Sequence, residues 1–376
     1  MTKVIKLTHI ISDTNIGGAG KYLLAYLNNC DRNTFDISVI VPTNSRLIKE
    51  IEALGFKVIV VDGMADKSFS TKAVNELIKV FKAEKPDIVH THATLSGRIA
   101  ARIAGVKTIV YTRHSVFEPK EYLTKGIGKC INGCVGGYLS DRIIAVAGAA
   151  KKNLTDTGIK DENIDVIYNG VDGLSEISYD LKVEVKKAFG IREDEFVIAI
   201  IARLELVKGH EYFIDAAGLV KDAGIKARFV IAGTGTREEA LRSYAKEKGL
   251  DDVVLFTGFL NNVSHLMNIM DIQANASFGT EAASLSLLEG MSIGKPAVVS
   301  DFGGNPELIK DDLNGYVVPK QNATALANAI IKLLSDENLR NKISKQSREV
   351  FENRFTSRIM TNNMESFYKN ICEVKR

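Results

Sequence analysis

The sequence has few of the features that mark secreted or membrane-spanning chains. It contains four cysteines, Cys30, Cys130, Cys134 and Cys372, and only Cys130 and Cys134 lie close together. Because no pair of histidines stands near them, this is not a zinc pattern, and four cysteines in 376 residues do not make a disulfide scaffold. No signal-peptide segment opens the sequence, and no run approaches the ~18–20 apolar residues of a membrane span. We therefore expect a cytoplasmic protein.

The sequence also lacks a strong net charge. Its 49 basic and 46 acidic residues leave +3, which gives no case for nucleic-acid binding. Positive charge gathers in residues 98–152, which carry ten basic and three acidic side chains. The plainer interpretation is a solvated basic face, and the sharper one is a patch for an anionic acceptor or membrane surface.

Short β-branched runs alternate with helical patterns along the whole chain. A chain of 376 residues exceeds what one core usually supports, which predicts two domains. Continuous Val/Ile runs predict strands buried on both faces, as in a parallel sheet, and so an α/β fold with two doubly wound domains. The predicted strands are residues 4–11, 36–42, 57–62, 87–92, 108–114, 141–147 and 164–170, then 196–202, 227–233, 253–258, 272–277 and 296–300.

The rhythm breaks between residues 172 and 190, which we interpret as an interdomain linker with an entry helix. The expected domains are residues 1–175, joined by a C-terminal helix at 357–376, and residues 176–356. Further helices are predicted at residues 20–30, 71–84, 209–224, 236–249, 261–270 and 285–293, with a helical tail from Thr324. In such sheets ligands bind beyond the carboxyl ends of the strands, so the loops after strands carry the informative residues.

Two of these loops suggest a site for an anionic or polar ligand. "NIGGAG" follows the first strand, where Gly17 and Gly18 allow a close backbone approach and a helix N-terminus favours an anion. It is not the GxGxxG dinucleotide fingerprint, and a tight turn is the plainer interpretation. In "IARLELVKGHE", Arg203 and Lys208 could together hold a diphosphate; two surface cations are the alternative.

The stretch "GTEAASLSLLEG" places two carboxylates eight positions apart. If a helix begins near Ser284, that serine is its N-cap, Glu281 lies in the preceding loop and Glu289 lies inside the helix. Eight residues at the helical rise give a separation of ~12 Å, too far for one acid–base pair. We interpret the acids as two contacts on one long ligand, with one exposed and one salt-bridged acid as the plainer interpretation.

Three of the six histidines, His90, His92 and His114, fall at the ends of predicted strands in the first domain. Strand alternation places His90 and His92 on one face. The plainer interpretation of each is a hydrogen-bonded wall residue, and none has metal-ligand spacing with an acid or a cysteine.

Together these motifs resemble the retaining glycosyltransferases of family 4. "EAASLSLLE" fits the family's E-x7-E motif, "ARLELVKG" its R-x4-K-G segment and "NIGGAG" its Gly-Gly loop. "FTGFLNN" at 256–262 and "DFGGNPELI" at 301–309 resemble two further segments, in the family's order along essentially the whole chain. The resemblance implies the GT-B fold, with two Rossmann-like domains facing across a cleft.

The resemblance also implies residue roles. Arg203 and Lys208 would bind the diphosphate of a nucleotide-sugar donor, most simply UDP- or GDP-linked, and Glu289 the ribose hydroxyls. The catalytic set would consist of Arg203, Lys208, Glu281 and His92. Of these, Glu281 would contact the sugar. The remaining donor-binding residues would be Gly17, Gly18, His114, Gly233, Phe259, Ala283, Ser284 and Leu285.

The sequence departs from the family pattern after Glu281, where the family usually has glycines and this chain has Ala282, Ala283 and Ser284. Methyl groups there narrow the approach of the backbone to the sugar. No DxD motif stands at a suitable strand end. We therefore expect a metal-independent transfer without a cofactor, and the resemblance implies retention of the anomeric configuration.

Other classes remain as alternatives. A nicotinamide-dependent dehydrogenase predicts GxGxxG and an acid ending strand two, and the sequence has neither. A sugar-nucleotide 2-epimerase would use the same scaffold and donor without an acceptor. A non-catalytic periplasmic sugar-binding protein would need an export signal.

The acceptor is expected to be a sugar, a lipid-linked intermediate or a polysaccharide of the cell surface. Residues 122–139, "YLTKGIGKCINGCVGGYL", combine apolar and basic side chains that could lie on an anionic membrane. Peripheral contact with the inner membrane face is therefore a further hypothesis. The plainer interpretation is a glycine-containing helix packed on the first sheet.

Overall fold

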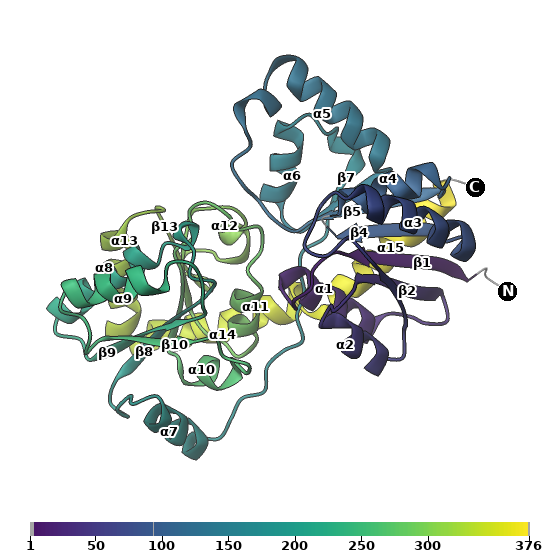
Figure 1. Ribbon diagram of the computed structural model, residues 1–376. Helices are drawn as coiled ribbons and strands as arrows, with labels where there is room; N and C mark the ends of the chain where they lie inside the picture. The colour runs from purple at the N-terminus through teal and green to yellow at the C-terminus, as the bar shows by residue number, and fades with distance from the viewer. Residues whose placement is uncertain (1–3, 93, 375–376) are drawn as a thin grey trace. The chain divides into compact units, whose positions relative to one another are not determined.

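The computed structural model describes residues 4–92 and 94–374 (Figure 1). The chain forms two compact units. The first unit consists of two segments, the residues up to Gly170 and those from Ser357 on. The second unit spans Val171–Thr356. Within the described residues, no helix has both the length and the apolar character that crossing a bilayer requires.

The first unit is built on a seven-stranded sheet of order β3-β2-β1-β4-β5-β6-β7, in which every pair is parallel. Its strands are β1 (Ile5–Ile11), β2 (Phe35–Pro42), β3 (Lys57–Val61), β4 (Ile88–His92), β5 (Thr108–Arg113), β6 (Arg142–Ala145) and β7 (Ile164–Val166). Its helices are α1 (Gly18–Asn29), α2 (Leu47–Ala53), α3 (Thr71–Glu84), α4 (Leu95–Ile103), α5 (Gly126–Leu139), α6 (Gly148–Asp156) and α15 (Ser357–Val374), with 3-10 turns at Glu121–Leu123 and Asp161–Asn163.

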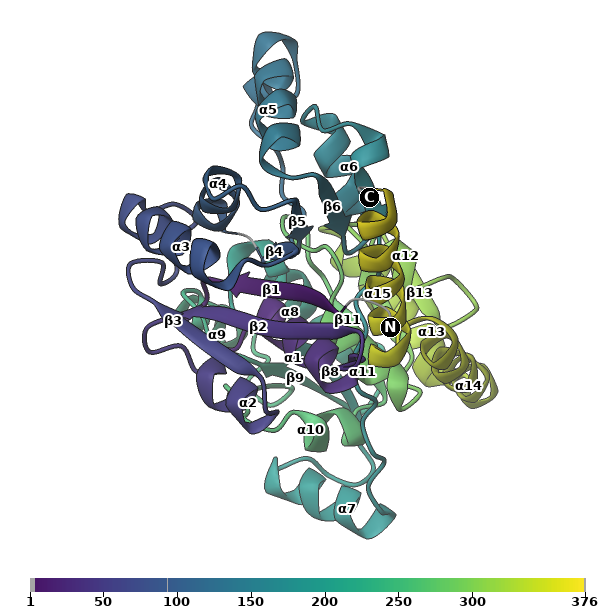
Figure 2. The same cartoon turned by 90° about the vertical axis from the view of Figure 1, so that its right-hand side faces the viewer.

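The two faces of this sheet differ in chemistry because side chains alternate along a strand. One face is apolar: Ile10 and Val89 pack with Leu77 and Phe81 of α3 and with residues of α4. The other face carries His9, His90 and His92 and meets aromatic side chains of α1 and α15. Figure 2 shows α3 and α4 side by side, and the last helix of the chain, α15, packs against the first, α1.

The second unit has a six-stranded parallel sheet of order β10-β9-β8-β11-β12-β13. Its strands are β8 (Phe196–Ile201), β9 (Ala227–Ala232), β10 (Val254–Gly258), β11 (Ile272–Asn275), β12 (Ala297–Ser300) and β13 (Gly315–Val318). Its helices are α7 (Tyr179–Ala188), α8 (His210–Asp222), α9 (Glu238–Glu247), α10 (Ser264–Ile269), α11 (Leu285–Ser292), α12 (Asn305–Leu308), α13 (Ala323–Ser335) and α14 (Glu337–Arg354), with a 3-10 turn at Leu206–Lys208.

Both faces of this second sheet are buried, as the uninterrupted Val/Ile runs predicted. Ile198 and Ile200 of β8 face a core formed with α8, α9 and α13. Val197 and Ala199 face the opposite core, formed with α7 and α10. The doubly wound α/β architecture expected from the sequence is therefore confirmed in both units.

The structure also has elements that the sequence pattern did not predict. β13 is a four-residue strand whose apolar run was too short to stand out, and α2 is a seven-residue helix without a capping side chain. The predicted domain boundary followed residue 175, whereas the first unit ends at Gly170.

Candidate active site

The predicted donor-binding residues of the second unit all follow the carboxyl ends of parallel strands. Arg203 comes directly after β8, Gly233 after β9 and Phe259 after β10. The Glu281 loop follows β11. Arg203 and Phe259 are exposed, and Phe259 is among the more exposed apolar side chains of the unit. Because carboxyl ends of parallel strands share one edge of the sheet, these loops lie at that edge.

Lys208 and Glu281 form an ion pair at the centre of this edge. Nζ of Lys208 lies 2.9 Å from Oε2 of Glu281, and it also donates to the carbonyl of Thr280 at 2.8 Å. The two side chains are only 13% and 11% exposed. The same carboxylate oxygen accepts from Asn275 at 3.3 Å and Ser277 at 3.2 Å. An ammonium group has three N–H donors. Because Lys208 uses two of them on Glu281 and Thr280, one is left for a ligand.

A wider network holds this pair in place. Asn305, in the "DFGGNPELI" segment, donates to the side chain of Asn275 at 3.4 Å and to Ser300 at 3.2 Å. The backbone N–H of Gly304 donates to the carbonyl of Glu281. The structure therefore joins three motifs that are separate in sequence. Sequence reasoning missed Asn275, Ser277 and Asn305, whose signal was only their place at or after strand ends.

The turn after Lys208 requires glycine. Gly209 has φ of +71°, and a Cβ there would lie 2.2 Å from the carbonyl oxygen of Ala276. Only a residue without a side chain allows both that backbone conformation and that approach. The K-G pair of the R-x4-K-G segment thus lies along the loop after β11, with Gly209 beside Ala276 and Lys208 beside Thr280 and Glu281.

Helix α11 begins where the sequence predicted. Ser284 is its N-cap, and its hydroxyl accepts from the backbone N–H of Leu287 at 3.4 Å. Glu281 lies in the preceding loop, and Glu289, partly exposed, lies in the second turn of the helix. The ~12 Å separation assumed a helix over all eight residues. That assumption was wrong, because residues 281–284 are not helical, so helical rise does not give the distance between the two acids.

In the first unit, the Gly-Gly loop leads into α1. Gly17 is the N-cap residue and makes no side-chain cap; like Gly18, it is exposed. Neither has a positive φ, so the turn itself does not require glycine at these positions. Asp13, which the sequence analysis missed, lies close to Gly17. Burial and the neighbouring Asp66 carboxylate raise the pKa of Asp13.

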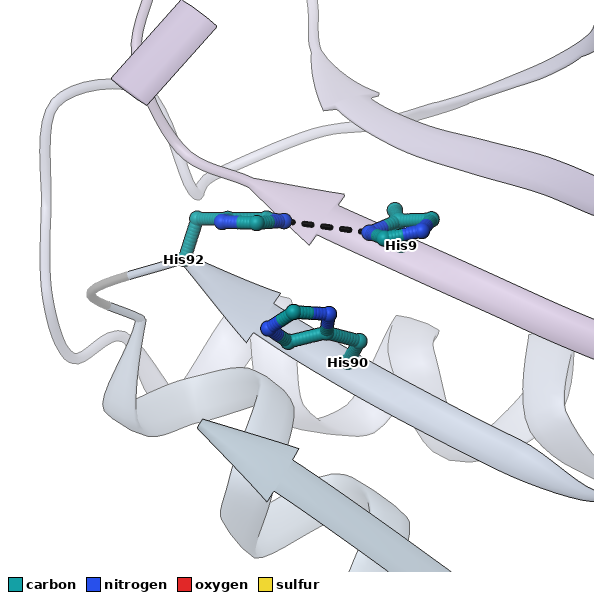
Figure 3. A group of neighbouring side chains, drawn as sticks. All are labelled: His9, His90 and His92. Atoms are coloured by element: carbon teal, nitrogen blue, oxygen red, sulfur yellow. Dashed lines mark hydrogen bonds between the residues drawn. The ribbon is translucent and has the colours of Figure 1, made fainter. Parts of the chain in front are cut away.

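Four histidines gather on one face of the first sheet, beside α1. His9 and His90 are register partners in β1 and β4, and the rings of His90 and His92 lie 4.5 Å apart, as alternation predicted. Nδ1 of His9 lies 3.0 Å from Nε2 of His92, and Nδ1 of His92 lies 2.9 Å from Nε2 of His114. Figure 3 shows the first of these bonds, with the rings of His9 and His92 edge to edge. Both nitrogens of His92 are therefore engaged within the protein.

His90 makes a separate pair of hydrogen bonds. Its Nδ1 lies 2.5 Å from the hydroxyl of Tyr368 in α15, and its Nε2 lies 2.6 Å from Oγ1 of Thr112 in β5. His9, His90 and His92 have no exposed surface, and His114 is partly exposed. His114 is thus the member of this group that solvent or a ligand can reach.

Burial keeps these imidazoles neutral. It lowers the pKa of His9 to about 3 and that of His114 to about 4. Burial, followed by the neighbouring imidazoles, lowers the pKa of His90 and of His92 well below the usual value. Each ring therefore carries one N–H donor and one lone pair near neutral pH.

The ligand atoms of His9, His90 and His92 all lie within 4.8 Å of one another, near enough for three imidazoles to share a metal ion. The sequence analysis missed this group because it compared histidines only with acids and cysteines. An ion would have to displace hydrogen bonds, since both nitrogens of His90 and of His92 already have partners. Hydrogen bonding among neutral side chains is the interpretation we adopt for this group.

The fold and these strand-end loops define a glycosyltransferase of the GT-B class. Residues 16–173 match the family described as Glycosyltransferase Family 4, and residues 182–350 match the family described as Glycosyl transferases group 1. The two family models together cover most of the chain, which therefore belongs to the glycosyltransferases that they describe. It is an enzyme of the glycosyl-transferring class. The resemblance drawn from the motifs is confirmed.

Several relatives align over most of the chain. A UDP-Gal:alpha-D-GlcNAc-diphosphoundecaprenol alpha-1,3-galactosyltransferase of Escherichia coli is 28% identical over 363 residues, 93% of each chain. An N-acetyl-alpha-D-glucosaminyl L-malate synthase of Bacillus anthracis is 27% identical over 305 residues, 79% of this chain and 78% of that protein. Among solved structures, Anabaena HepE in complex with UDP-glucose is 20% identical with a TM-score of 0.84, covering 97% of this chain and all of that one.

Proposed function

We propose that the protein transfers a sugar from a UDP-sugar to an acceptor hydroxyl, with retention of configuration and without a metal ion. The observation that carries this proposal is the Lys208–Glu281 network at the carboxyl edge of the second sheet, in a chain of this family. The nucleotide is proposed as UDP because relatives that span nearly the whole chain use or bind UDP-linked sugars.

In the reaction, the bond between the anomeric carbon and the diphosphate oxygen breaks, and a bond from that carbon to the acceptor oxygen forms. The acceptor proton passes to the departing phosphate. The main task of the protein is then to stabilise negative charge on the diphosphate. Arg203 and the remaining N–H of Lys208 supply positive charge there, and Glu281 fixes the position of the lysine.

Two assays test the chemistry. The protein is incubated with UDP-glucose, UDP-galactose and UDP-N-acetylglucosamine, with and without acceptor, and released UDP and the anomeric configuration of the product are measured. We expect UDP release that depends on acceptor, a retained configuration and full activity in EDTA. Inversion, or loss of activity in EDTA that Mg²⁺ restores, contradicts the corresponding part of the proposal. Conversion of the UDP-sugar without acceptor would instead favour the 2-epimerase alternative.

We propose a lipid-linked sugar as the acceptor, in cell-surface polysaccharide or glycolipid synthesis. The E. coli relative acts on a GlcNAc-diphosphoundecaprenol and aligns over nearly the whole chain. The first assay should therefore include a polyprenyl-diphosphate sugar beside a soluble sugar acceptor. Transfer to the soluble sugar alone would contradict this part.

Helix α5 supports a peripheral membrane contact. Of its residues only Leu139 is buried, which is little for a helix packed on a sheet. A Cβ at Gly133 would lie 2.2 Å from the carbonyl oxygen of Gly158, so the glycine side of the helix packs closely against the backbone that follows α6. The opposite side is an apolar stripe at helical spacing, each member between 50% and 79% exposed: Ile127, Ile131, Val135 and Tyr138.

We propose that this stripe rests on an anionic membrane surface. Basic side chains accompany it: Lys120 and Lys125 are exposed in the preceding residues, and Arg102 of α4 lies over the ring of Tyr138 at 5.3 Å. Apolar insertion together with basic residues, each worth about 1 kcal/mol near an anionic surface, is the usual basis of interfacial binding. An exposed apolar stripe of this kind otherwise marks a protein interface.

The chain offers a matched control for this contact. Val135 in α5 and Val60 in β3 belong to the same unit and are both 50% exposed. We expect the protein to float with phosphatidylglycerol vesicles at low salt, the Val135→Glu variant to lose flotation and the Val60→Glu variant to keep it. Equal loss in both variants contradicts the assignment. So does a dimer in light scattering that Val135→Glu dissolves, because the stripe would then bind a second copy.

A further inference from the structure

The three imidazoles of His9, His92 and His114 form one continuous hydrogen-bonded chain from the buried interior to a partly exposed end. Each is neutral and has one N–H and one lone pair, and His92 uses both of its nitrogens within the chain. The tautomer of one ring therefore fixes the tautomers of the other two.

Only two arrangements are consistent with these bonds. In the first, all three rings carry hydrogen on Nδ1: His9 donates to His92, His92 donates to His114, and His114 presents an N–H on its remaining nitrogen. In the second, all three carry hydrogen on Nε2, the bonds run the other way and His114 presents a lone pair. The two arrangements offer opposite groups to a ligand at His114.

The buried end of the chain favours the first arrangement. Nε2 of His9 and the hydroxyl of Tyr26 are both buried without a hydrogen-bond partner among the described residues, and the two rings lie 5.2 Å apart. In the first arrangement Nε2 of His9 is a lone pair, so of these two groups only the Tyr26 hydroxyl is a buried donor without an acceptor. In the second, Nε2–H of His9 is a further buried donor without an acceptor, so two buried hydrogens stay unpaired instead of one, which is costly.

We propose that His9, which no ligand can reach, is a positioning residue that holds His114 as an Nδ1–H donor toward an oxygen of the donor sugar. This inference rests on the proposed function, since it deepens the role of His114. It also makes His92 the link between the two, because both of its nitrogens are bonded to imidazoles.

The tautomers can be measured directly in the protein without substrate. The chain has six histidines, so the side-chain nitrogens of ¹⁵N-histidine-labelled protein give few signals, and single variants assign them. Long-range ¹H–¹⁵N spectra distinguish a protonated from an unprotonated ring nitrogen. We expect His9, His92 and His114 all in the Nδ1–H form. An Nε2–H form at His114 overturns the proposal.

Three substitutions of His9 test its role. His9→Asn places an amide N–H near the position of Nδ1 and should keep His114 in the Nδ1–H form. His9→Gln places its amide near the position of Nε2, and His9→Phe has no polar atom, so both should leave His114 in a mixture of tautomers. An unchanged Nδ1–H form in His9→Phe overturns the role of His9. If His9→Phe fails to fold, the parent and His9→Asn spectra still decide.

Kinetics then connect the tautomer to the donor. With UDP-glucose or whichever of the three UDP-sugars is turned over, His9→Phe should lower kcat/KM about 2- to 12-fold, the worth of one ordinary hydrogen bond. His9→Asn should restore it, and the affinity for UDP, which lacks the sugar, should not change. A changed His114 tautomer with unchanged kcat/KM overturns the contact with the donor. Absence of turnover with every UDP-sugar is a failure of the proposed function, which the spectra distinguish from a failure of the histidine chain.

Discussion

The buried histidines predict that acid destabilises the first unit well above the pH at which carboxylates titrate. A histidine whose pKa is lower in the folded state than in the unfolded state binds its proton on unfolding. Its stabilising contribution is therefore present above the unfolded pKa of about 6.5 and is lost as the pH falls toward the folded value. His9, with a folded pKa of about 3, and His114, with one of about 4, both titrate in this sense.

The size of the effect follows from linkage. At about pH 5 each of these two histidines is roughly 1.5 pH units below its unfolded pKa, which costs about 2 kcal/mol at about 1.36 kcal/mol per unit. Together they cost about 4 kcal/mol, a large part of the 5–15 kcal/mol that stabilises a typical domain. The lowered pKa values of His90 and His92 act in the same direction. The raised pKa of Asp13 acts in the opposite direction, because its contribution is present at low pH and is lost as the pH rises through the folded value.

Urea unfolding followed by hydrogen exchange of peptides that cover β1 and β4 reports the first unit by itself. We expect its free energy of unfolding to fall steeply from about pH 7 to about pH 5. His9→Phe should make this fall less steep, because one histidine fewer binds a proton on unfolding. His265→Phe should leave it unchanged, because His265 lies in α10 of the second unit. A free energy of the first unit that stays constant or rises on acidification over this range would refute the reasoning.

Three further predictions concern the second unit. Lys208→Met should cost about 3 kcal/mol of stability, because it leaves Glu281 without its cation. The double variant with Glu281→Gln should regain stability in thermal denaturation but not activity, and recovery of both would contradict a role in transfer. Glu289→Ala should weaken UDP-sugar binding by about 10- to 150-fold in calorimetry and leave acceptor binding unchanged, and unchanged donor affinity would remove the proposed ribose contact. Gly190→Ala should lower the unfolding free energy by about 1–2 kcal/mol, because Gly190 has a positive φ but open space around it. Gly209→Ala should cost more, because Gly209 has a similar φ and also lies close to the carbonyl of Ala276; equal costs would mean that this close approach does not matter.

Local patterns in the sequence were sufficient for most of the secondary structure. Continuous Val/Ile runs predicted buried parallel strands because both faces of such strands are covered. Ser284 predicted the start of α11 because a hydroxyl one residue before a helix accepts one of its unpaired N–H groups. β13 was missed because it has only four residues, the first of them a glycine, and so carries too little pattern.

Motif order was sufficient for the family and the kind of reaction, since each motif lies in a loop after a strand. The motifs did not show how their side chains meet. Lys208 was predicted to bind phosphate and Glu281 the sugar, each by itself, and the structure pairs the two across 73 positions of sequence. The roles of Arg203, Glu289, Gly233 and Phe259 in donor binding stay predictions.

The sequence by itself therefore determined two parallel α/β units, the loops that carry the chemistry and the glycosyltransferase family, because these depend on short-range periodicity and on motif spacing. Only the tertiary structure decided that His9 lies 3.0 Å from His92 although 83 positions separate them. That contact exists because β1 pairs with β4 in the register that sets His9 beside His90, and a slip of one residue would turn the imidazoles to the opposite face. The outward stripe of α5 was likewise decided by packing, because the glycine side of the helix lies against the backbone at Gly158 and the apolar side stays exposed.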